Sequence, residues 1–201
     1  DKVSIIVRTC GRPEVLRGAL ESIRKQTYPD VETVVIEDGL EISRQMICTE
    51  YSDLQLRYIS TGKRVGRAKA GNLGMKVAQG KYLNFLDDDD VLYPEHIEIL
   101  LQTLQSAEEK AVYSVAEEAA AIYRKRKRTF YDVRKKVRFR EPFNRMYLLH
   151  TNYLPIQSVM FEKSLFEQYG GFRENVDYLE DWDLWVRYAA HTNFKMVNEI
   201  T

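Results

Sequence analysis

The sequence contains few cysteines. Its 201 residues include two, Cys10 and Cys48, which are too few for a disulfide framework and lack the spacing of a metal site. We therefore expect two reduced thiols buried in the protein interior. Reduced thiols are typical of the cytoplasm, which is the compartment that we predict.

Long apolar runs are also absent. No segment approaches the ~18 consecutive apolar residues of a membrane span, and no signal peptide precedes the first strand-like run. The length fits one domain, and neither a repeat nor a low-complexity linker divides it. The chain begins at Asp1, directly before that run, and stops at Thr201 shortly after another strand-like run. We therefore expect a domain cut from a longer protein, whose flanks could carry a targeting segment.

The chain has no net charge. Thirty Lys and Arg residues balance thirty Asp and Glu residues, which argues against a general nucleic-acid-binding protein. The charge is nevertheless uneven. Segment 124–140 has ten Lys or Arg residues and one Asp, a net +9, which leaves −9 for the rest of the chain.

Strand-like and helix-like segments alternate through the first half of the chain. Short apolar runs predict buried strands, and apolar residues three or four positions apart predict helices. The expected strands cover 3–7, 31–36, 54–59 and 82–86, and the expected helices cover 13–23, 42–50, 70–78 and 97–104. This alternation predicts a Rossmann-like α/β fold, with a mostly parallel central sheet and helices on both faces.

The second half is less regular. Segment 111–123 fits either a strand or a helix, because its Ala and Glu centre favours a helix and its ends favour a strand. Alternating aromatic and basic residues predict a hairpin at 129–139. A strand at 157–161 and helices at 163–169 and 178–190 are expected to follow.

Polar residues follow three of the predicted parallel strands, as Thr9 to Arg12, Glu37-Asp38 and Asp87 to Asp90. In such sheets ligands bind beyond the carboxyl ends of the strands. Four adjacent carboxylates repel one another unless a cation binds or their pKa rises. Their oxygen atoms favour Mg²⁺ or Mn²⁺, which often bind one or two carboxylates together with substrate phosphates. The alternative is an acidic turn that caps the next helix, but the position at a strand end favours a site.

Several motifs occur along the chain in one order: VSIIVRTCGRPEVLRGALESIRKQTYPDVETVVIEDG, AGNLGMKVAQGKYLNFLDDDD, GGF and EDWDLWVR. With these motifs the sequence closely resembles the inverting family 2 glycosyltransferases of the GT-A fold, and the match covers almost the whole chain. The resemblance implies one catalytic domain over residues 1–201. Its nucleotide-sugar-binding half would cover about 1–105, and a smaller acceptor-binding half about 106–201.

In that family the stretch written here as FLDDDD carries the metal-binding DxD motif. The resemblance implies that Asp89 ligates Mn²⁺ or Mg²⁺, that Asp88 lies near the donor ribose and that Asp87 completes the motif. Four consecutive aspartates leave this register open by one residue. The ion would bridge the two phosphates of the donor and neutralise charge on the leaving diphosphate.

The resemblance also implies a nucleobase site. Asp38 matches the family position that hydrogen-bonds the base, and Thr9 matches a contact to the same base. Because an Asp can accept the imide proton of uracil, we expect a UDP-sugar donor. Turn formation by the Asp-Gly pair is the alternative explanation. The candidates for donor binding are Thr9, Arg12, Glu37, Asp38, Lys69, Asn72, Asp87 and Asp88.

Two positions at or near these candidates depart from the family pattern. Glu37 stands where Asp is commoner, and Gly71 stands where an Arg often precedes the Asn. Lys69, Arg67 or Arg64 could supply the missing positive charge to a phosphate, and an exposed basic helix face is the alternative.

Asp181, in EDWDLWVR, matches the general base of the family. It would take the proton of the acceptor hydroxyl while that oxygen attacks the anomeric carbon opposite the leaving phosphate, which inverts the configuration. Acidic residues that stabilise a helix N-terminus are the alternative. Trp182 and Trp185 either line the acceptor pocket or pack in the core. His150 and Asn152 fall where acceptor loops often lie.

The basic segment 124–140 is the least family-like stretch. It fits either a solvated hairpin or a surface for an anionic membrane or a lipid-linked diphosphate acceptor, which would place the protein at the inner membrane face. Two other functions remain open. One is a non-catalytic nucleotide-sugar-binding domain of a larger protein. The other is a sugar-1-phosphate nucleotidyltransferase, which is less favoured because TCGRPEVL holds a single Gly where a Gly-rich phosphate loop is needed.

Overall fold

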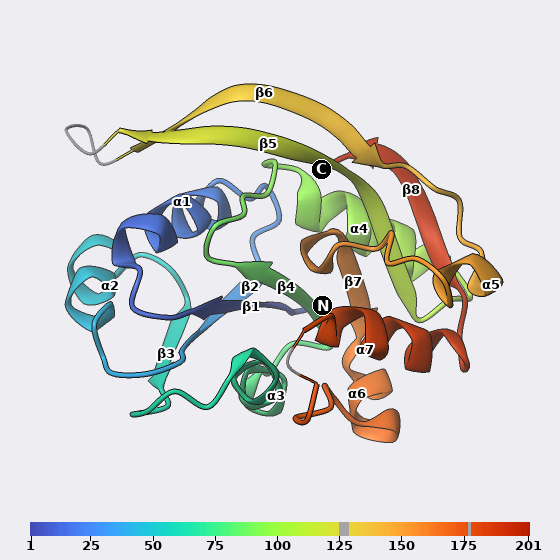
Figure 1. Cartoon of the computed structure of the whole chain (residues 1–201), viewed down its shortest axis with the longest axis horizontal. Helices are drawn as coiled ribbons and strands as arrows, with labels where there is room; N and C mark the ends of the chain where they lie inside the picture. The colour runs from blue at the N-terminus through green and yellow to red at the C-terminus, as the bar shows by residue number, and fades with distance from the viewer. Residues whose placement is uncertain (125–128, 177) are drawn as a thin grey trace.

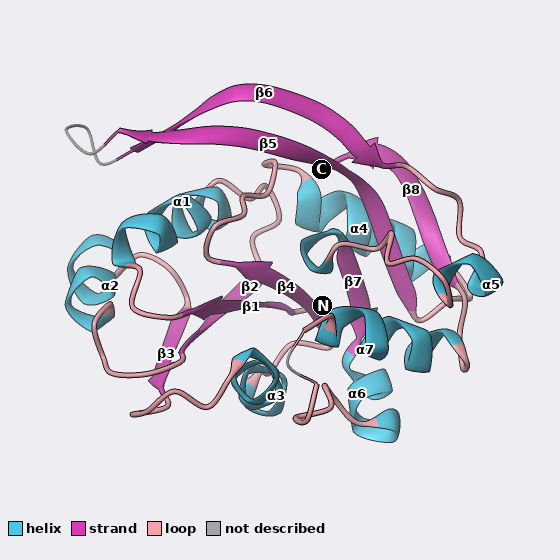
Figure 2. Cartoon of the chain, viewed as in Figure 1, coloured by secondary structure: helices cyan, strands magenta, loops and turns pink. Residues whose placement is uncertain are grey.

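The computed structural model describes residues 1–124, 129–176 and 178–201, which form an eight-stranded sheet (Figures 1 and 2). Its order is β3-β2-β1-β4-β7-β5-β6, and β8 pairs with β5. The strands are β1 (Val3–Thr9), β2 (Val31–Glu37), β3 (Leu56–Ser60), β4 (Tyr82–Asp87), β5 (Ala111–Arg124), β6 (Thr129–Phe139), β7 (Val159–Glu162) and β8 (Phe194–Ile200). The first four are mutually parallel, and β7 runs antiparallel to both β4 and β5.

Helices cover both faces of the sheet (Figure 2). The helices are α1 (Pro13–Arg24), α2 (Arg44–Glu50), α3 (Arg67–Val77), α4 (His96–Ser106), α5 (Arg145–Leu148), α6 (Lys163–Tyr169) and α7 (Glu180–Ala189), with a 3-10 turn η1 (Ile156–Ser158) before β7. One apolar core lies under α1, α2 and α4, and the other under α3, α6 and α7. The predicted α/β sheet with helices on both faces is therefore confirmed.

Strand β1 shows why the sheet needs two cores. Successive side chains of a strand point to opposite faces. Ile5 and Val7 accordingly pack in the core under α1, and Ile6 packs in the core under α3. A strand that is buried on both faces reads as a continuous apolar run, which is the pattern that predicted the parallel strands.

The long hairpin of β5 and β6 decides one open sequence-based expectation and corrects another. Segment 111–123 is a strand throughout, because Val112 and Val115 are fully buried and the start of β5 pairs with β7 and β8. This tertiary pairing overrides the helical preference of its Ala and Glu residues. Segment 129–139 is one strand of the hairpin and not a hairpin by itself, since β6 pairs antiparallel with β5. Figure 1 shows the hairpin running along the top of the domain, over α4 and α1.

Two smaller features also differ from expectation. Cys10 is half-buried and Cys48 is exposed, so the prediction of two buried thiols is wrong, although both are free. Helix α7 begins at Glu180, two residues later than predicted, because Leu179 adopts a left-handed conformation with φ 59°. The strand-like run near Thr201 is strand β8. No helix in the described ranges is long and apolar enough to cross a membrane.

Candidate active site

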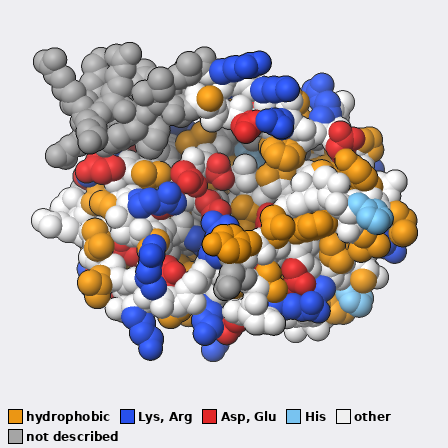
Figure 3. Space-filling view, viewed as in Figure 1, with side chains coloured by type: hydrophobic (Ala, Val, Ile, Leu, Met, Phe, Trp, Pro, Cys, Tyr) orange, Lys and Arg blue, Asp and Glu red, His pale blue; other side chains and the backbone are white. Residues whose placement is uncertain are grey.

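The carboxyl ends of β1, β2 and β4 open into one cleft of about 710 Å³. Its lining comprises Arg8, Thr9, Cys10, Arg12, Asp38, Arg64, Gly66, Arg67, Ala70, Asp87, Asp88, Asp89 and Tyr178. In Figure 3 acidic and basic side chains lie together near the middle of this face. The structure thus brings together the three polar loops, as the parallel sheet predicted, and adds basic residues from the start of α3.

Asp88 and Asp89 have different surroundings, although they are neighbours. Asp88 is buried and accepts a hydrogen bond of 2.6 Å from the Thr9 hydroxyl and an ion pair from Arg12. Burial raises the pKa of Asp88, while Thr9 and Arg12 act in the opposite direction. The side chain of Asp89 is 56% exposed, and it forms a longer ion pair with the Arg12 Nη1 atom at 3.4 Å. Asp89 is therefore accessible from the cleft, whereas Asp88 holds the first loop in place.

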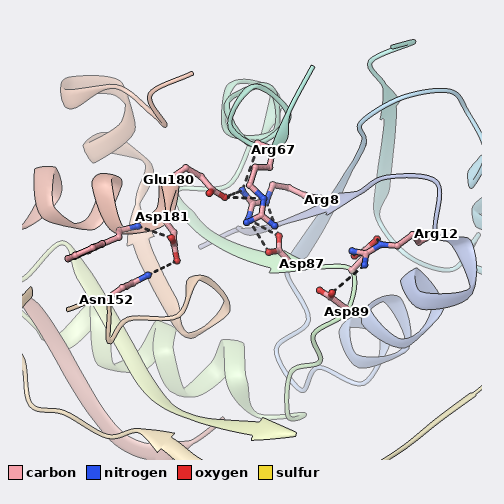
Figure 4. A network of polar contacts seen from close by, with 10 residues as sticks. Arg8, Arg12, Arg67, Asp87, Asp89, Asn152, Glu180 and Asp181 are labelled. Atoms are coloured by element: carbon pink, nitrogen blue, oxygen red, sulfur yellow. Dashed lines mark hydrogen bonds and ion pairs between the residues drawn. The ribbon is translucent and has the colours of Figure 1, made fainter. Parts of the chain in front are cut away.

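Arg8 links Asp87 to the opposite half of the site (Figure 4). Its guanidinium donates to both oxygens of Asp87, at 2.9 and 3.1 Å, and to Glu180 Oε1 at 2.8 Å. Arg8 and Glu180 are both buried. Glu180 precedes Asp181, so this ion-pair cluster connects the aspartates of β4 with the start of α7. Arg8 was not among the sequence-based candidates, although an arginine inside a buried strand requires a buried partner.

Asp38 and Glu37 bind backbone groups of neighbouring loops. The Asp38 carboxylate accepts from the amides of Val65 and Gly66, at 2.6 and 3.0 Å, and it lies on the cleft wall. Glu37 is fully buried and accepts from the amide of Ser43 at 2.9 Å and from the Tyr58 hydroxyl. Glu37 therefore stabilises the loops around the cleft and does not line it.

Lys69 and Asn72 lie on α3 but outside the cleft lining. The Asn72 amide makes two hydrogen bonds to the backbone of Phe172, at 2.9 and 2.8 Å. Lys69 lies 3.9 Å from Glu174. The cationic residues of α3 and its preceding loop that line the cleft are Arg64 and Arg67. They are the two other residues that the sequence indicated for phosphate binding.

Phe172 also explains the departure at Gly71. A Cβ atom at Gly71 would lie 2.5 Å from Phe172 Cε2, which is closer than atoms can pack. With Phe172 in this position, the chain cannot carry the arginine that the family often has there. This part of the chain instead contributes Arg64 and Arg67 to the lining of the cleft.

Asp181 lies on the far side of the Arg8 cluster, as Figure 4 shows. One oxygen accepts from Asn152 Nδ2 at 3.1 Å, and the other accepts from the Trp182 amide at 2.8 Å. Burial raises the pKa of Asp181, and these two hydrogen bonds partly offset that effect. A raised pKa makes a carboxylate a stronger base than an exposed aspartate, which suits it to accept a proton.

The other acceptor-side candidates separate into packed and exposed residues. Trp185 is fully buried and donates to the Leu154 carbonyl at 3.0 Å, so it packs in the core. Trp182 is half-buried and donates to the Leu148 carbonyl at 2.5 Å. His150 is exposed, and Asn152 contacts Asp181 directly. Tyr178, which was not a sequence-based candidate, lines the cleft and is 82% exposed.

Among the described residues, no three His, Cys, Asp or Glu side chains converge on one point as a metal site. The carboxylate of this motif that is exposed to the cleft, and could therefore meet an ion, is Asp89, whereas both oxygens of Asp87 are bound by Arg8. A single exposed carboxylate fits an ion that takes its remaining ligands from substrate phosphates and water.

Comparison with known proteins identifies the family. The sequence model of Glycosyl transferase family 2 matches residues 4–170, which is most of the chain, and the chain belongs to this family. The uncharacterized glycosyltransferase YwdF of Bacillus subtilis (strain 168) is 31% identical over 197 residues, which are 98% of this chain and 71% of that protein. The uncharacterized glycosyltransferase RP339 of Rickettsia prowazekii (strain Madrid E) is 29% identical over 206 residues, 98% of this chain and 62% of that protein.

Solved structures share the fold. TarS 1–349 of S. aureus superposes with a TM-score of 0.77 at 19% identity, over 99% of this chain and 58% of that one. The mannosyltransferase PcManGT of Pyrobaculum calidifontis, in complex with GDP-Man and Mn²⁺, has a TM-score of 0.73 at 18% identity, over 100% of this chain and 56% of that one. The predicted GT-A fold is thus confirmed, and the protein is a glycosyltransferase by family. The chain spans just over half the length of these two structures.

Proposed function

We propose that the protein transfers a sugar from a UDP-sugar to an acceptor hydroxyl, with inversion at the anomeric carbon and with a divalent metal ion. The observation that carries the proposal is the arrangement of two acidic groups around one ion-pair cluster. Asp89 is accessible from the cleft, Asp181 is half-buried on the other side, and Arg8 connects Asp87 and Glu180 between them. A donor site and a base on opposite sides suit an in-line displacement.

In the proposed reaction Asp181 accepts the proton of the acceptor hydroxyl. The acceptor oxygen forms a bond to the anomeric carbon, and the bond from that carbon to the phosphate oxygen breaks, so the leaving diphosphate keeps the electron pair. Asn152 and the Trp182 amide hold the two Asp181 oxygens in place. Arg64 and Arg67 offer positive charge to the diphosphate from the wall of the cleft.

The carboxylate oxygens of the cleft fit Mn²⁺ or Mg²⁺ as ligands. Asp89 would hold the ion, because its carboxylate is exposed and the Asp88 carboxylate is already bound to Thr9 and Arg12. When bound, the ion would supply charge neutralisation to the leaving diphosphate. The structure of PcManGT with GDP-Man and Mn²⁺ supports metal use within this fold.

The choice of UDP is based on Asp38 and on a neighbouring structure. TarS 1–349 is known in complex with UDP-GlcNAc, with a TM-score of 0.76 to this chain. PcManGT instead binds GDP-Man, so the fold alone does not select the base. Asp38 and Thr9 line the cleft at the ends of β2 and β1, where the base would lie.

We further propose a glycan or lipid-linked acceptor and peripheral contact with the inner membrane face. In the described part of segment 124–140, five basic residues are exposed on or just after β6, namely Arg134, Lys135, Lys136, Arg138 and Arg140. The side chains of the other basic residues of this segment, and those of the aromatic Phe130 and Tyr131, lie outside the described residues. Flotation with anionic vesicles tests this contact, and absence of binding would rule it out.

A thermal-shift screen tests the donor proposal. Because a ligand that binds only the folded state raises the melting temperature, UDP and UDP-sugars should stabilise the protein, and more strongly with Mn²⁺ than with EDTA. GDP and GDP-mannose serve as matched controls for the base. Release of UDP from the stabilising UDP-sugar then separates an enzyme from a non-catalytic binding domain, which would bind without turnover.

A further inference from the structure

The buried ion-pair cluster of Arg8 joins two segments that are far apart in the sequence. Arg8 lies on β1 directly opposite Asp87 on β4 in the parallel register. Its third nitrogen, Nη1, donates to Glu180, which is 172 residues away in the sequence and is the first residue of α7. One side chain therefore connects the end of the aspartate strand with the helix that carries Asp181.

Burial makes this connection costly. Arg8 is 6% exposed and Glu180 is 1% exposed, and removing such charges from water carries a large desolvation penalty. The rings of Phe85 and Phe172 flank the guanidinium, at 5.6 and 5.5 Å from its carbon to their centroids. A well-packed apolar residue would often give equal or greater stability at such a place. A role in geometry explains the charged cluster better than a role in stability.

The guanidinium of Arg8 is suited to fix the position of Asp87 relative to Glu180. It is planar, and its nitrogens donate in fixed directions, so two bonds to Asp87 and one to Glu180 define both distance and orientation. These three nitrogens are already used by carboxylates. Arg67 is 55% exposed and also approaches Glu180, at 3.6 Å, so it is better placed than Arg8 to meet a ligand in the cleft.

We propose that Arg8 is a positioning residue, which sets the distance between the donor-site aspartates of β4 and Asp181 through its bonds to Asp87 and Glu180. This inference rests on the proposed function, because it assumes that Asp181 is the base. Arg8 borders the cleft, but its three nitrogens are bound to Asp87 and Glu180, so in this proposal it acts through these two carboxylates. Loss of Arg8 or of Glu180 should change how often Asp181 is correctly placed, and it should not change how tightly the nucleotide binds.

The test is the split between kcat and KM in Arg8→Lys and Glu180→Gln. Arg8→Lys keeps the positive charge but loses the planar group that donates to both carboxylates. Glu180→Gln keeps the size of the side chain but loses its negative charge. We expect kcat for UDP release from the UDP-sugar to fall roughly 10- to 100-fold, since small misplacement of reacting groups has effects of this size. The donor KM and the Kd of UDP should remain near the values of the unaltered protein.

Arg187→Lys is the matched control. Arg187 is a half-buried arginine of the same region, and it binds Asp183 at 2.9 Å and the Gly171 carbonyl at 2.5 Å, but neither of these partners lies on β4. This variant should lower the melting temperature with little change in kcat. The double variant Arg8→Lys/Glu180→Gln should lose no more activity than the more damaged single variant, because both changes break the same link.

Three results would overturn the inference. An unchanged kcat in folded Arg8→Lys would show that the link does not position Asp181, and a raised Kd for UDP with unchanged kcat would make Arg8 a donor ligand instead. If kcat fell as much in Arg187→Lys as in Arg8→Lys, general destabilisation would explain the loss of activity in both variants. If Arg8→Lys does not fold, Glu180→Gln decides by the same criteria. Binding of UDP-sugars without turnover by the unaltered protein would instead contradict the proposed function, and the inference with it.

Discussion

The side-chain amide of Asn152 donates a hydrogen bond of 3.1 Å to the carboxylate of Asp181. Asn152 comes from the segment between α5 and η1, whereas Asp181 lies in the first turn of α7. The contact fixes one oxygen of the proposed base, and the amide oxygen of Asn152 stays buried without a partner in the described part of the chain.

Asp181→Asn should abolish sugar transfer and leave nucleotide binding almost intact. The amide cannot accept the proton of the acceptor hydroxyl, and loss of a general base typically costs about 10²- to 10⁴-fold in rate. UDP release and UDP affinity are measured on the same preparation. Asp183→Asn, in the same turn of the helix, is the control, because Asp183 binds Arg187 and Arg173. Full activity of Asp181→Asn would disprove the base assignment.

The pH profile of kcat should report the raised pKa of Asp181. A base works in its ionised form, so activity is present above its pKa and is lost as the pH falls through it. Because burial raises this pKa, the acid limb should lie above the ~3.9 of an ordinary Asp. Asn152→Ala removes a hydrogen bond that lowers the pKa, so the limb should move to higher pH. Asn144→Ala, which removes the cap of α5, should leave the limb unmoved.

Asp89→Ala should remove the metal-dependent part of nucleotide binding. If Asp89 holds the ion, UDP should stabilise this variant equally with Mn²⁺ and with EDTA. A tenfold weaker Kd lowers the stabilisation by about 1.4 kcal/mol at saturating ligand, which a thermal-shift assay detects. The control is Glu108→Gln, an exposed carboxylate after α4 that is not part of the cleft lining. An undiminished Mn²⁺ effect in Asp89→Ala would assign the ion to another carboxylate.

Gly71→Ala should destabilise the fold, although alanine favours helices. The new Cβ would lie 2.5 Å from Phe172, and overpacking of this kind typically costs about 1–3 kcal/mol. In Gly18→Ala, within α1, the Cβ would lie 4.0 Å from Val91, so that variant should gain up to about 1 kcal/mol. The two free energies of unfolding are compared by urea denaturation. Equal stability of both variants would show that Phe172 moves aside freely.

The parallel half of the fold was predictable because its strands are buried on both faces and therefore read as apolar runs. The hairpin was not predictable in the same way. The part of β5 from Glu117 to Ala120 consists of Glu and Ala residues, which do not favour strands, and it is a strand because it pairs with β6. Strand β8 has exposed residues at several positions, so its sequence indicated a strand-like run but not the bounds of an element.

The part of the site that follows the parallel strands was predictable, because ligands bind beyond the carboxyl ends of such strands. Thr9, Arg12 and three of the four aspartates, Asp87 to Asp89, indeed line one cleft. The sequence could not show that Asn72 and Glu37 bind backbone groups elsewhere, because those contacts depend on loops from distant segments. Whether any of these residues binds the donor stays a prediction.

The position of β6 has a consequence for the behaviour of the protein at high concentration. In the described part of the chain, β6 ends the sheet order, so one of its sides offers backbone groups to another strand. Such an edge can pair with a second molecule and start aggregation. The exposed Arg134, Lys136 and Arg138 place like charges along this edge, so two copies repel each other there. Because Arg138 also pairs with Glu118, the unbalanced charge along this edge comes mainly from the rest of the strand, and we expect it to oppose edge-to-edge pairing of two copies.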